Sequence, residues 1–270
     1  MSGTGAVRIV IEIVIERLRL VRRRRVAAAL ALGLALLLGM VLAVGLAAWL
    51  LTPGVDDLQV RVAALAAARG STVVERGAVP PLLARALVDT EDERFYQHHG
   101  IDLIGLGRAF LFDVSHGCLC QGGSTITQQL AKDVYLNGSD AGLNKLADMA
   151  LALKVEFRYD KAQILADYAS IVGVGIDRYG MANGACAYFG VSLDGLDLPQ
   201  AALLAGMPEA PSAYDPLVHR AEATARRAHV LDAMVSEGDI TGASAAAANG
   251  APLVSPPASP ASCGAASPPG

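Results

Sequence analysis

Residues 121–133 read QGGSTITQQLAKD, a short run in which hydroxyls, two adjacent amides and a lysine follow a glycine pair. Gly122 and Gly123 allow a sharp turn, because glycine adopts backbone conformations that other residues avoid. Thr125 and Gln128 have the three-residue spacing of a capping box, which predicts that a helix begins here. The run therefore predicts a tight turn followed by a helix whose first residues are unusually polar.

The start of that helix is suited to an anion. The free N–H groups and the helix dipole at an N-terminus favour negative charge, especially phosphate. Ser124 and Thr127 supply hydroxyls there, and Lys132 could add a positive charge two turns further on. An ordinary capped helix in water is the alternative, and it leaves the adjacent Gln128 and Gln129 least well explained.

The flanking sequence predicts a domain that is nearly all helical over residues 55–241. Residues 82–98 have the apolar spacing of an amphipathic helix that ends before Gly100. Asp160 has the position of an N-terminal cap for a later helix. Because no alternation of strands and helices supports a parallel sheet, the predicted fold class is mainly α.

One long apolar run contributes strongly to the 53% hydrophobic content of the 270 residues. Residues 26–51 carry no charge, and a helix needs roughly 20 such residues to cross a bilayer. Arginines beside a span tend to stay in the cytoplasm, so Arg22–Arg25 predict a basic cytoplasmic segment at residues 1–25. The rest of the chain would then lie on the periplasmic or extracellular face of an inner or plasma membrane. A cleaved signal peptide is the alternative, but the run is too long for its apolar core.

Composition argues against a nucleic-acid partner. The net charge is near −4 and aromatic residues make up 5% of the chain, so neither a bulk positive charge nor a stacking surface is indicated. Residues 242–270 are mostly Ala, Ser, Pro and Gly, and they lack the apolar pattern of a core. That composition predicts a disordered tail.

Four cysteines follow the apolar run, at Cys118, Cys120, Cys186 and Cys263. A location outside the cytoplasm permits disulfides, but spacing alone does not fix which cysteines pair. Unpaired thiols are the alternative, and the sequence CLC is weak evidence for a metal site.

Glu91 is the first candidate for chemistry. If residues 82–98 form one helix, Glu91, Phe95 and His98 share a face, because they are spaced at i, i+4 and i+7. Partial burial there would raise the pKa of the carboxyl group and make it a usable base. The alternative is a solvated acidic turn with Phe95 in the core.

Charges later in the chain give further candidates. Asp148 follows Lys145 by three residues on a predicted helix, and Arg226 and Arg227 are adjacent in RRAHVL. Each has a plain structural alternative: a surface ion pair for Asp148 and a solvated helix face for the arginines.

Taken in order behind an apolar span, these segments resemble the peptidoglycan glycosyltransferases, the transglycosylase family of penicillin-binding proteins and their single-domain relatives. The resemblance covers about residues 80–235 and rests on two long motifs. The family's Glu-Asp-x-x-Phe-x-x-His-x-Gly matches residues 91–100, and its Gly-x-Ser-Thr-Ile-Thr-Gln-Gln matches residues 122–129. A third motif, Arg-Arg-x-x-Val-Leu, matches residues 226–231.

The resemblance implies a lysozyme-like helical domain that polymerises lipid II into β-1,4 glycan strands and releases undecaprenyl pyrophosphate. It implies Glu91 as general base and Asp148 as a second catalytic carboxylate, with a divalent metal, Mg or Mn, assisting in some members. Expected partners are lipid II, the growing glycan strand, the membrane and other cell-wall synthesis proteins. The implied substrate-binding residues are Asp92, Phe95, His98, Gly123, Ser124, Thr125, Thr127, Gln128, Gln129, Lys132, Lys145, Arg226 and Arg227.

The apolar residues 102–114 match a region that dips into the bilayer in this family, with core packing as the alternative. Asn144 and Asp148 stand where the family motif Arg-Lys-x-x-Glu has arginine and glutamate. These changes favour a second hypothesis, a weakened relative that binds lipid II as a scaffold. A third hypothesis is a lysozyme-like hydrolase that cuts glycan.

Overall fold

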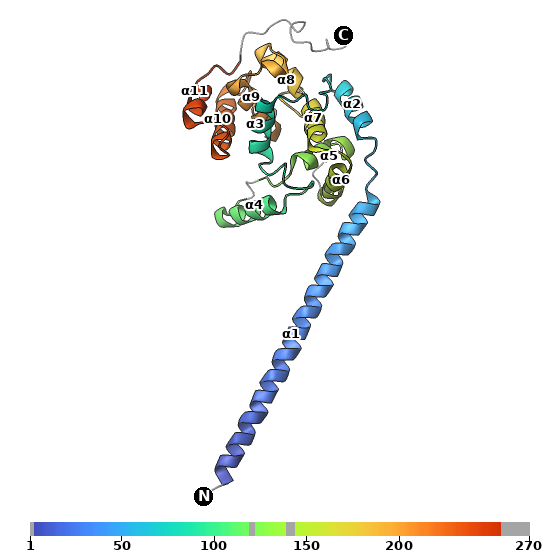
Figure 1. Cartoon of the computed structure of the whole chain (residues 1–270), viewed down its shortest axis with the longest axis vertical. Helices are drawn as coiled ribbons and strands as arrows, with labels where there is room; N and C mark the ends of the chain where they lie inside the picture. The colour runs from blue at the N-terminus through green and yellow to red at the C-terminus, as the bar shows by residue number, and fades with distance from the viewer. Residues whose placement is uncertain (1–2, 119–121, 139–143, 255–270) are drawn as a thin grey trace. The chain divides into compact units, whose positions relative to one another are not determined.

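The computed structural model describes residues 3–118, 122–138 and 144–254, and within these ranges it contains helices and no strand (Figure 1). The chain divides into two compact units, Met1–Leu51 and Thr52–Gly270. The α-helices are α1 (Gly3–Leu51), α2 (Leu58–Ala68), α3 (Pro81–Glu91), α4 (Leu103–His116), α5 (Ile126–Tyr135), α6 (Asn144–Arg158), α7 (Lys161–Ile171), α8 (Met181–Phe189), α9 (Leu198–Gly206), α10 (Arg220–Ser236) and α11 (Gly242–Asn249). Short 3₁₀ turns η1 (Leu193–Gly195) and η2 (Met207–Glu209) complete the element order. The predicted mainly α fold is confirmed.

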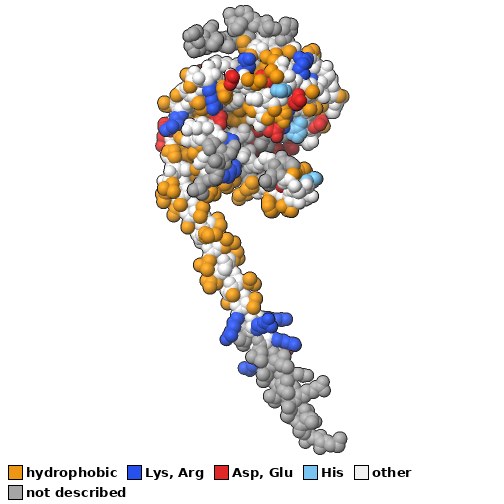
Figure 2. Space-filling view, turned by 180° about the vertical axis from the view of Figure 1, so that it is seen from behind, with side chains coloured by type: hydrophobic (Ala, Val, Ile, Leu, Met, Phe, Trp, Pro, Cys, Tyr) orange, Lys and Arg blue, Asp and Glu red, His pale blue; other side chains and the backbone are white. Residues whose placement is uncertain are grey.

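The first unit is the single helix α1. Its segment Arg22–Leu51 is long and apolar enough to cross a membrane, by length and composition. Figure 2 shows the apolar side chains bounded by a group of basic ones, as the order of Arg22–Arg25 and residues 26–51 requires. The predicted N-terminal apolar helix is confirmed, whereas its orientation across a membrane stays a prediction.

In the second unit, α7 lies in the core and packs against α2, α5, α6 and α8. Every residue from Ile164 to Ile171 is buried, which explains why this helix shows no polar face. Helix α3 packs against α9 and α10, and α5 packs against α6 and α7. Each fully buried Leu or Ile in such contacts stabilises the fold by about 1.5–3 kcal/mol relative to exposure.

Helix α3 ends seven residues before its predicted end, at Glu91 rather than His98. The following residue, Asp92, has an extended φ of −161°, so the backbone leaves the helix there. Its carboxylate accepts a hydrogen bond from the backbone N–H of Ile126 at 3.0 Å, a contact from distant sequence that no local pattern could reveal. The prediction that Glu91, Phe95 and His98 share one helix face is therefore wrong.

The beginning of the predicted disordered tail is folded. Residues 242–249 form α11, capped by the Thr241 side chain, and Leu253 is buried. The structural reason is Arg227, which is 1% exposed and donates to the backbone carbonyls of Asn249, Ala251 and Pro252. Residues 255–270 of the predicted tail lie outside the described residues.

Two of the four cysteines, Cys118 and Cys186, are disulfide-bonded. No cysteine is free among those that the structure describes. Cys120 and Cys263 lie outside the described residues. Unpaired thiols are therefore excluded for Cys118 and Cys186.

Replacing Arg227 should destabilise the domain. We expect Arg227→Met to lower the free energy of unfolding by about 2–4 kcal/mol, because buried carbonyls lose a charged donor while the side-chain volume is kept. Denaturant unfolding measures the change, with the exposed Arg220→Met as the control. Equal stability of the two variants would contradict the assigned role of Arg227.

Candidate active site

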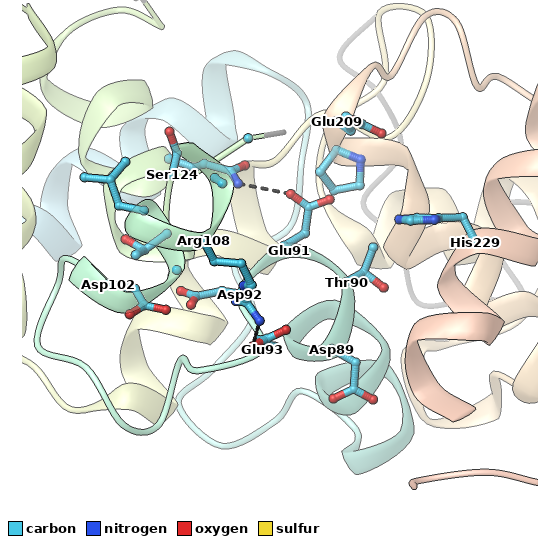
Figure 3. A pocket seen from close by; sticks show the side chains of 18 of the residues that line it. Asp89, Thr90, Glu91, Asp92, Glu93, Asp102, Arg108, Ser124, Glu209 and His229 are labelled. Carbon is cyan, nitrogen blue, oxygen red and sulfur yellow. Dashed lines mark hydrogen bonds and ion pairs between the residues drawn. The ribbon is translucent and has the colours of Figure 1, made fainter. Parts of the chain in front are cut away.

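A cleft of about 970 Å³ opens in the second unit, lined by the end of α3, by α4, by the start of α5 and by α10 (Figure 3). The loop that follows α9 closes one side with Pro208, Glu209 and Tyr214. Glu91 lies near the middle of the view, between Ser124 on one side and Glu209 and His229 on the other. The cleft therefore unites segments that are far apart in the sequence.

Glu91, the candidate base, lies almost buried in the wall of this cleft. Its side chain is 8% exposed, with Oε2 accepting from Gln129 Nε2 at 3.0 Å and Oε1 accepting from Arg226 Nη2 at 3.1 Å. Burial raises the pKa of Glu91, and the hydrogen bond from Gln129 and the charge of Arg226 oppose that shift only in part. A carboxylate with a raised pKa binds a proton more readily than an exposed one, which suits it to general-base chemistry.

The adjacent side chains of Gln128 and Gln129 contact different parts of the site. Gln129 accepts from the Tyr168 hydroxyl at 3.0 Å through Oε1, and this contact fixes its amide so that the NH₂ group faces Glu91. Gln128 instead accepts from the backbone N–H of Thr125 and donates to Asp148. One amide therefore orients the base and the other holds the start of α5.

The predicted capping box at the start of α5 is confirmed, and most of the backbone N–H groups that were expected to be free for an anion already have partners in the protein. Of the first four backbone donors, Thr125 N donates to Gln128 Oε1 and Gln128 N donates to Thr125 Oγ1. Ile126 N donates to the Asp92 carboxylate. The positive end of α5 thus already holds the protein's own anion, Asp92, as the helix dipole favours.

Asp92 also holds His98, and together they bind the turn after α3 to the start of α5. His98 Nε2 lies 2.8 Å from Asp92 Oδ1, and His98 Nδ1 accepts from the Gly100 backbone N–H. These partners assign the imidazole proton to Nε2, which donates to Asp92. Thr125 Oγ1 donates to the Gly100 carbonyl at 2.7 Å. Gly100 has a φ of +94°, and a Cβ atom there would lie 2.7 Å from the carbonyl of Ala152, so only glycine fits.

Asp148 is set back from the cleft. It is 3% exposed, is absent from the lining residues, and accepts from Gln128 Nε2 and Lys145 Nζ, each at 3.1 Å. Lys145 also donates to Ser124 Oγ at 3.0 Å, and Ser124 lines the cleft. Burial raises the pKa of Asp148, and Lys145 opposes the shift. Its described contacts fit a residue that positions Lys145 rather than one that meets a substrate.

The structure divides the sequence-predicted site residues into two groups. Those that line the cleft are Glu91, Asp92, Gly123, Ser124, Thr125, Gln129, Lys132 and Arg226. Those that are predicted for the site but do not line it are Phe95, His98, Thr127, Gln128, Lys145, Asp148 and Arg227. Phe95 is fully buried beneath Lys161, and Thr127 donates to Glu156, so both support the site from behind.

Several residues of the site were not predicted from the sequence. Tyr168 orients Gln129 from α7, whereas Arg108, Glu209, Tyr214 and His229 line the cleft itself. No role was predicted for any of them, because tertiary packing rather than helical spacing from Glu91 brings them to the site.

A protein-held metal ion finds no support in the described residues. Across residues 3–118, 122–138 and 144–254, no group of three or more His, Cys, Asp or Glu side chains is placed to hold one. The cations of the cleft wall are the side chains Arg108, Lys132 and Arg226. The described residues therefore do not fit a protein-held Mg or Mn ion.

The contact of Asp92 with α5 should be a large contributor to stability. We expect Asp92→Asn to cost about 2–3 kcal/mol, because the buried donors of His98 and Ile126 lose a charged acceptor. Glu93→Gln removes the neighbouring charge, whose pairing with Arg108 is partly exposed, and should cost under about 1 kcal/mol. Denaturant unfolding of both variants gives the comparison, and equal losses would refute the special role of Asp92.

Comparison with known proteins agrees with the site. The transglycosylase family matches residues 59–235, within the predicted domain of residues 55–241. Penicillin-binding protein 1A of Escherichia coli (strain K12) is 40% identical over 163 residues, which cover 60% of this chain and 19% of that protein. Penicillin-binding protein 1A of Haemophilus influenzae (strain ATCC 51907 / DSM 11121 / KW20 / Rd) is 42% identical over 159 residues, covering 59% of this chain and 19% of that protein.

The crystal structure of penicillin-binding protein 1A from Haemophilus influenzae covers 68% of this chain and 18% of its own, at 24% identity and a TM-score of 0.42. The chain thus spans about a fifth of the length of these relatives. The motif resemblance is confirmed, and with the family match extending over residues 59–235 the chain belongs to the transglycosylase family.

Proposed function

We propose that this chain is a peptidoglycan glycosyltransferase, which polymerises lipid II into β-1,4 glycan strands and releases undecaprenyl pyrophosphate. The observation that carries the proposal is Glu91, a nearly buried carboxylate with a raised pKa that lies in an open cleft beside cations. Membership of the transglycosylase family supports the same reaction class.

The reaction would begin at Glu91. Its carboxylate takes the proton from the 4-hydroxyl of the acceptor sugar as that oxygen bonds to the anomeric carbon of the donor. The bond between that carbon and the pyrophosphate oxygen breaks, its electron pair leaves with the pyrophosphate, and the anomeric configuration inverts. A positioned general base contributes about 10²–10⁴-fold to such a step.

Side chains would neutralise the departing pyrophosphate. The start of α5 is already occupied by Asp92 and by its own capping box, so it has few free N–H groups to offer. Lys132 lines the same cleft, and Lys145 reaches it through the hydroxyl of Ser124. Electrostatic stabilisation of developing charge is usually the largest catalytic contribution. In the proposed mechanism, Lys132 and Lys145 therefore stabilise the negative charge that develops on the departing pyrophosphate.

Two observations support a reaction at the outer face of a membrane. Disulfides at Cys118 and Cys186 favour a compartment outside the cytoplasm. Helix α4 lines the cleft with Leu106 and Phe112, yet it exposes 66% of Phe110 and 69% of Leu111. Core packing does not account for that exposed apolar face, and contact with lipid does.

The withdrawn position of Asp148 keeps the scaffold hypothesis as a second candidate. If the family's second carboxylate is needed for turnover, a chain with Asp148 behind the cleft would bind lipid II without polymerising it. Purified full chain in lipid vesicles with labelled lipid II separates the candidates: glycan product supports the enzyme, and binding without product supports the scaffold. Shortened strands from purified sacculi would instead indicate a hydrolase.

Loss of the base should abolish polymerisation. We expect Glu91→Gln to lower kcat by about 10²–10⁴-fold, because glutamine keeps the shape but cannot take up a proton. The exposed Glu75→Gln, in the connector before α3, serves as the matched charge control. Retention of more than a tenth of the activity in Glu91→Gln would exclude Glu91 as the base.

The exposed face of α4 should affect the capture of a lipid substrate. We expect the double variant Phe110→Ser, Leu111→Ser to raise the KM for vesicle-bound lipid II by about tenfold or more with little change in kcat, because apolar area that would enter lipid is removed. Val73→Ser, on an exposed connector, should leave the KM unchanged. An unchanged KM in the double variant would contradict lipid contact by α4.

A further inference from the structure

Arg226 lies between two carboxylates at one wall of the cleft. Its Nη2 donates to Glu91 Oε1 at 3.1 Å, and its Nη1 pairs with Glu209 Oε2 at 2.7 Å. Its Nε donates to the backbone carbonyl of Gly206 at 2.8 Å. The guanidinium is therefore fixed in three directions, and the Arg226 side chain is only 9% exposed.

Neighbouring residues hold Arg226 and Glu209 in contact. Gly206 ends α9, and a Cβ atom there would lie 2.9 Å from Arg226 Cγ, so a larger residue would displace the arginine. Tyr214 donates to Glu209 Oε2 at 3.3 Å and places its ring 5.6 Å from the guanidinium carbon. Glu209 is thus held beside Arg226 from the loop after α9, although its own side chain is 51% exposed.

We infer that Glu209 is a positioning residue, which shares the charge of Arg226 between two carboxylates and so keeps Glu91 able to accept a proton. The inference rests on the proposed function, because it concerns the same base. Neither the family motifs nor the sequence spacing assigns Glu209 a role.

Glu209 changes how strongly Arg226 acts on Glu91. A carboxylate paired with an arginine of its own is stabilised in its charged form, which lowers its pKa and weakens it as a base. Glu209 takes the shorter contact with Arg226, 2.7 Å against 3.1 Å, and its negative charge raises the pKa of Glu91. Arg226 can then orient Glu91 without acting as its dedicated counter-ion.

Other charged or titratable groups also surround Glu91. Asp92 follows it in the chain, and Tyr168 on α7 contacts it through Gln129. The further charged or titratable side chains that line the cleft are Asp89, Glu93, Asp102, Arg108, Lys132, Tyr214, Glu222 and His229. Among the contacts described for Arg226, the carboxylates of Glu91 and Glu209 are the two that share its guanidinium.

The direct test is a titration of the Glu91 carboxyl carbon by ¹³C NMR in the full chain, with the signal assigned by its loss in Glu91→Gln. We expect Glu209→Gln to lower the titration midpoint of Glu91 by about 0.5–1 pH unit, because Arg226 then acts on Glu91 alone. Glu209→Asp, which keeps the charge, should restore at least half of that shift. Glu222→Gln removes a carboxylate of the same cleft that has no described contact with Arg226, and it should leave the midpoint in place.

A pH–rate profile adds a functional readout. As pH falls through the pKa of Glu91, the base becomes protonated and activity is lost, so the acidic limb reports that pKa. In Glu209→Gln this limb should move to lower pH by the same amount as the NMR midpoint, with a lower plateau rate because the base is weaker.

The outcomes separate the inference from the proposed function. An unmoved Glu91 midpoint in Glu209→Gln overturns the inference, whether or not the chain makes glycan. A shifted midpoint in a chain that makes no glycan supports the role of Glu209 and counts against the proposed function instead.

Discussion

The carboxylate of Asp92 at the start of α5 is the constraint on which the site depends. By accepting from Ile126 N and from His98, it draws the chain out of α3 immediately after Glu91 and ties it to the beginning of α5. Glu91 is consequently the last residue of its helix, at the edge of the cleft and within reach of Gln129 one turn into α5. The motifs at residues 91–100 and 122–129 therefore contact each other directly, at the end of α3 and the start of α5.

The neighbouring acids Glu91 and Asp92 have different roles at this contact between α3 and α5. The carboxylate of Asp92 accepts hydrogen bonds from Ile126 N and His98, which stabilise the fold. It also occupies the positive end of α5, which a substrate phosphate could otherwise use. Glu91 receives only two donors, Gln129 and Arg226, and Arg226 is shared with Glu209. Because burial outweighs those donors, the pKa of Glu91 is raised, and the cleft holds a base whose charge is incompletely compensated. In the proposed mechanism, neutralisation of the leaving group would therefore fall to side chains such as Lys132 rather than to the helix end.

Sequence patterns were most informative where the relevant interactions are local. The capping box of Thr125 and Gln128, the cap at Asp160, the long apolar helix and the mainly α fold all follow from spacing or composition, and the structure confirms them. Sequence patterns gave wrong predictions where contacts between residues far apart in the sequence determine the structure. The end of α3 is set by a backbone donor of α5, and the folding of residues 242–249 is secured by Arg227.

The same distinction applies to the site. Motif membership identified Glu91, Ser124, Gln129 and Arg226, which line one cleft together with Lys132, predicted from its place on the same helix as Gln129. It could not tell these from residues that the fold needs behind the cleft, such as His98, Thr127 and Arg227, because one motif contains both kinds. No role was predicted for Glu209 or Tyr168, since the packing of α7 and of the loop after α9 brings them to Glu91.

The central claim is that Glu91 takes a proton from a sugar hydroxyl held in this cleft. The most direct measurement is a crystal structure of the full-length Glu91→Gln variant with a disaccharide acceptor and an unreactive pyrophosphate-linked donor. The account predicts the acceptor 4-hydroxyl within about 3 Å of the side-chain oxygen at position 91, the distance at which a general base can act. An acceptor hydroxyl held beside another carboxylate, or a sugar bound outside the cleft, would contradict it.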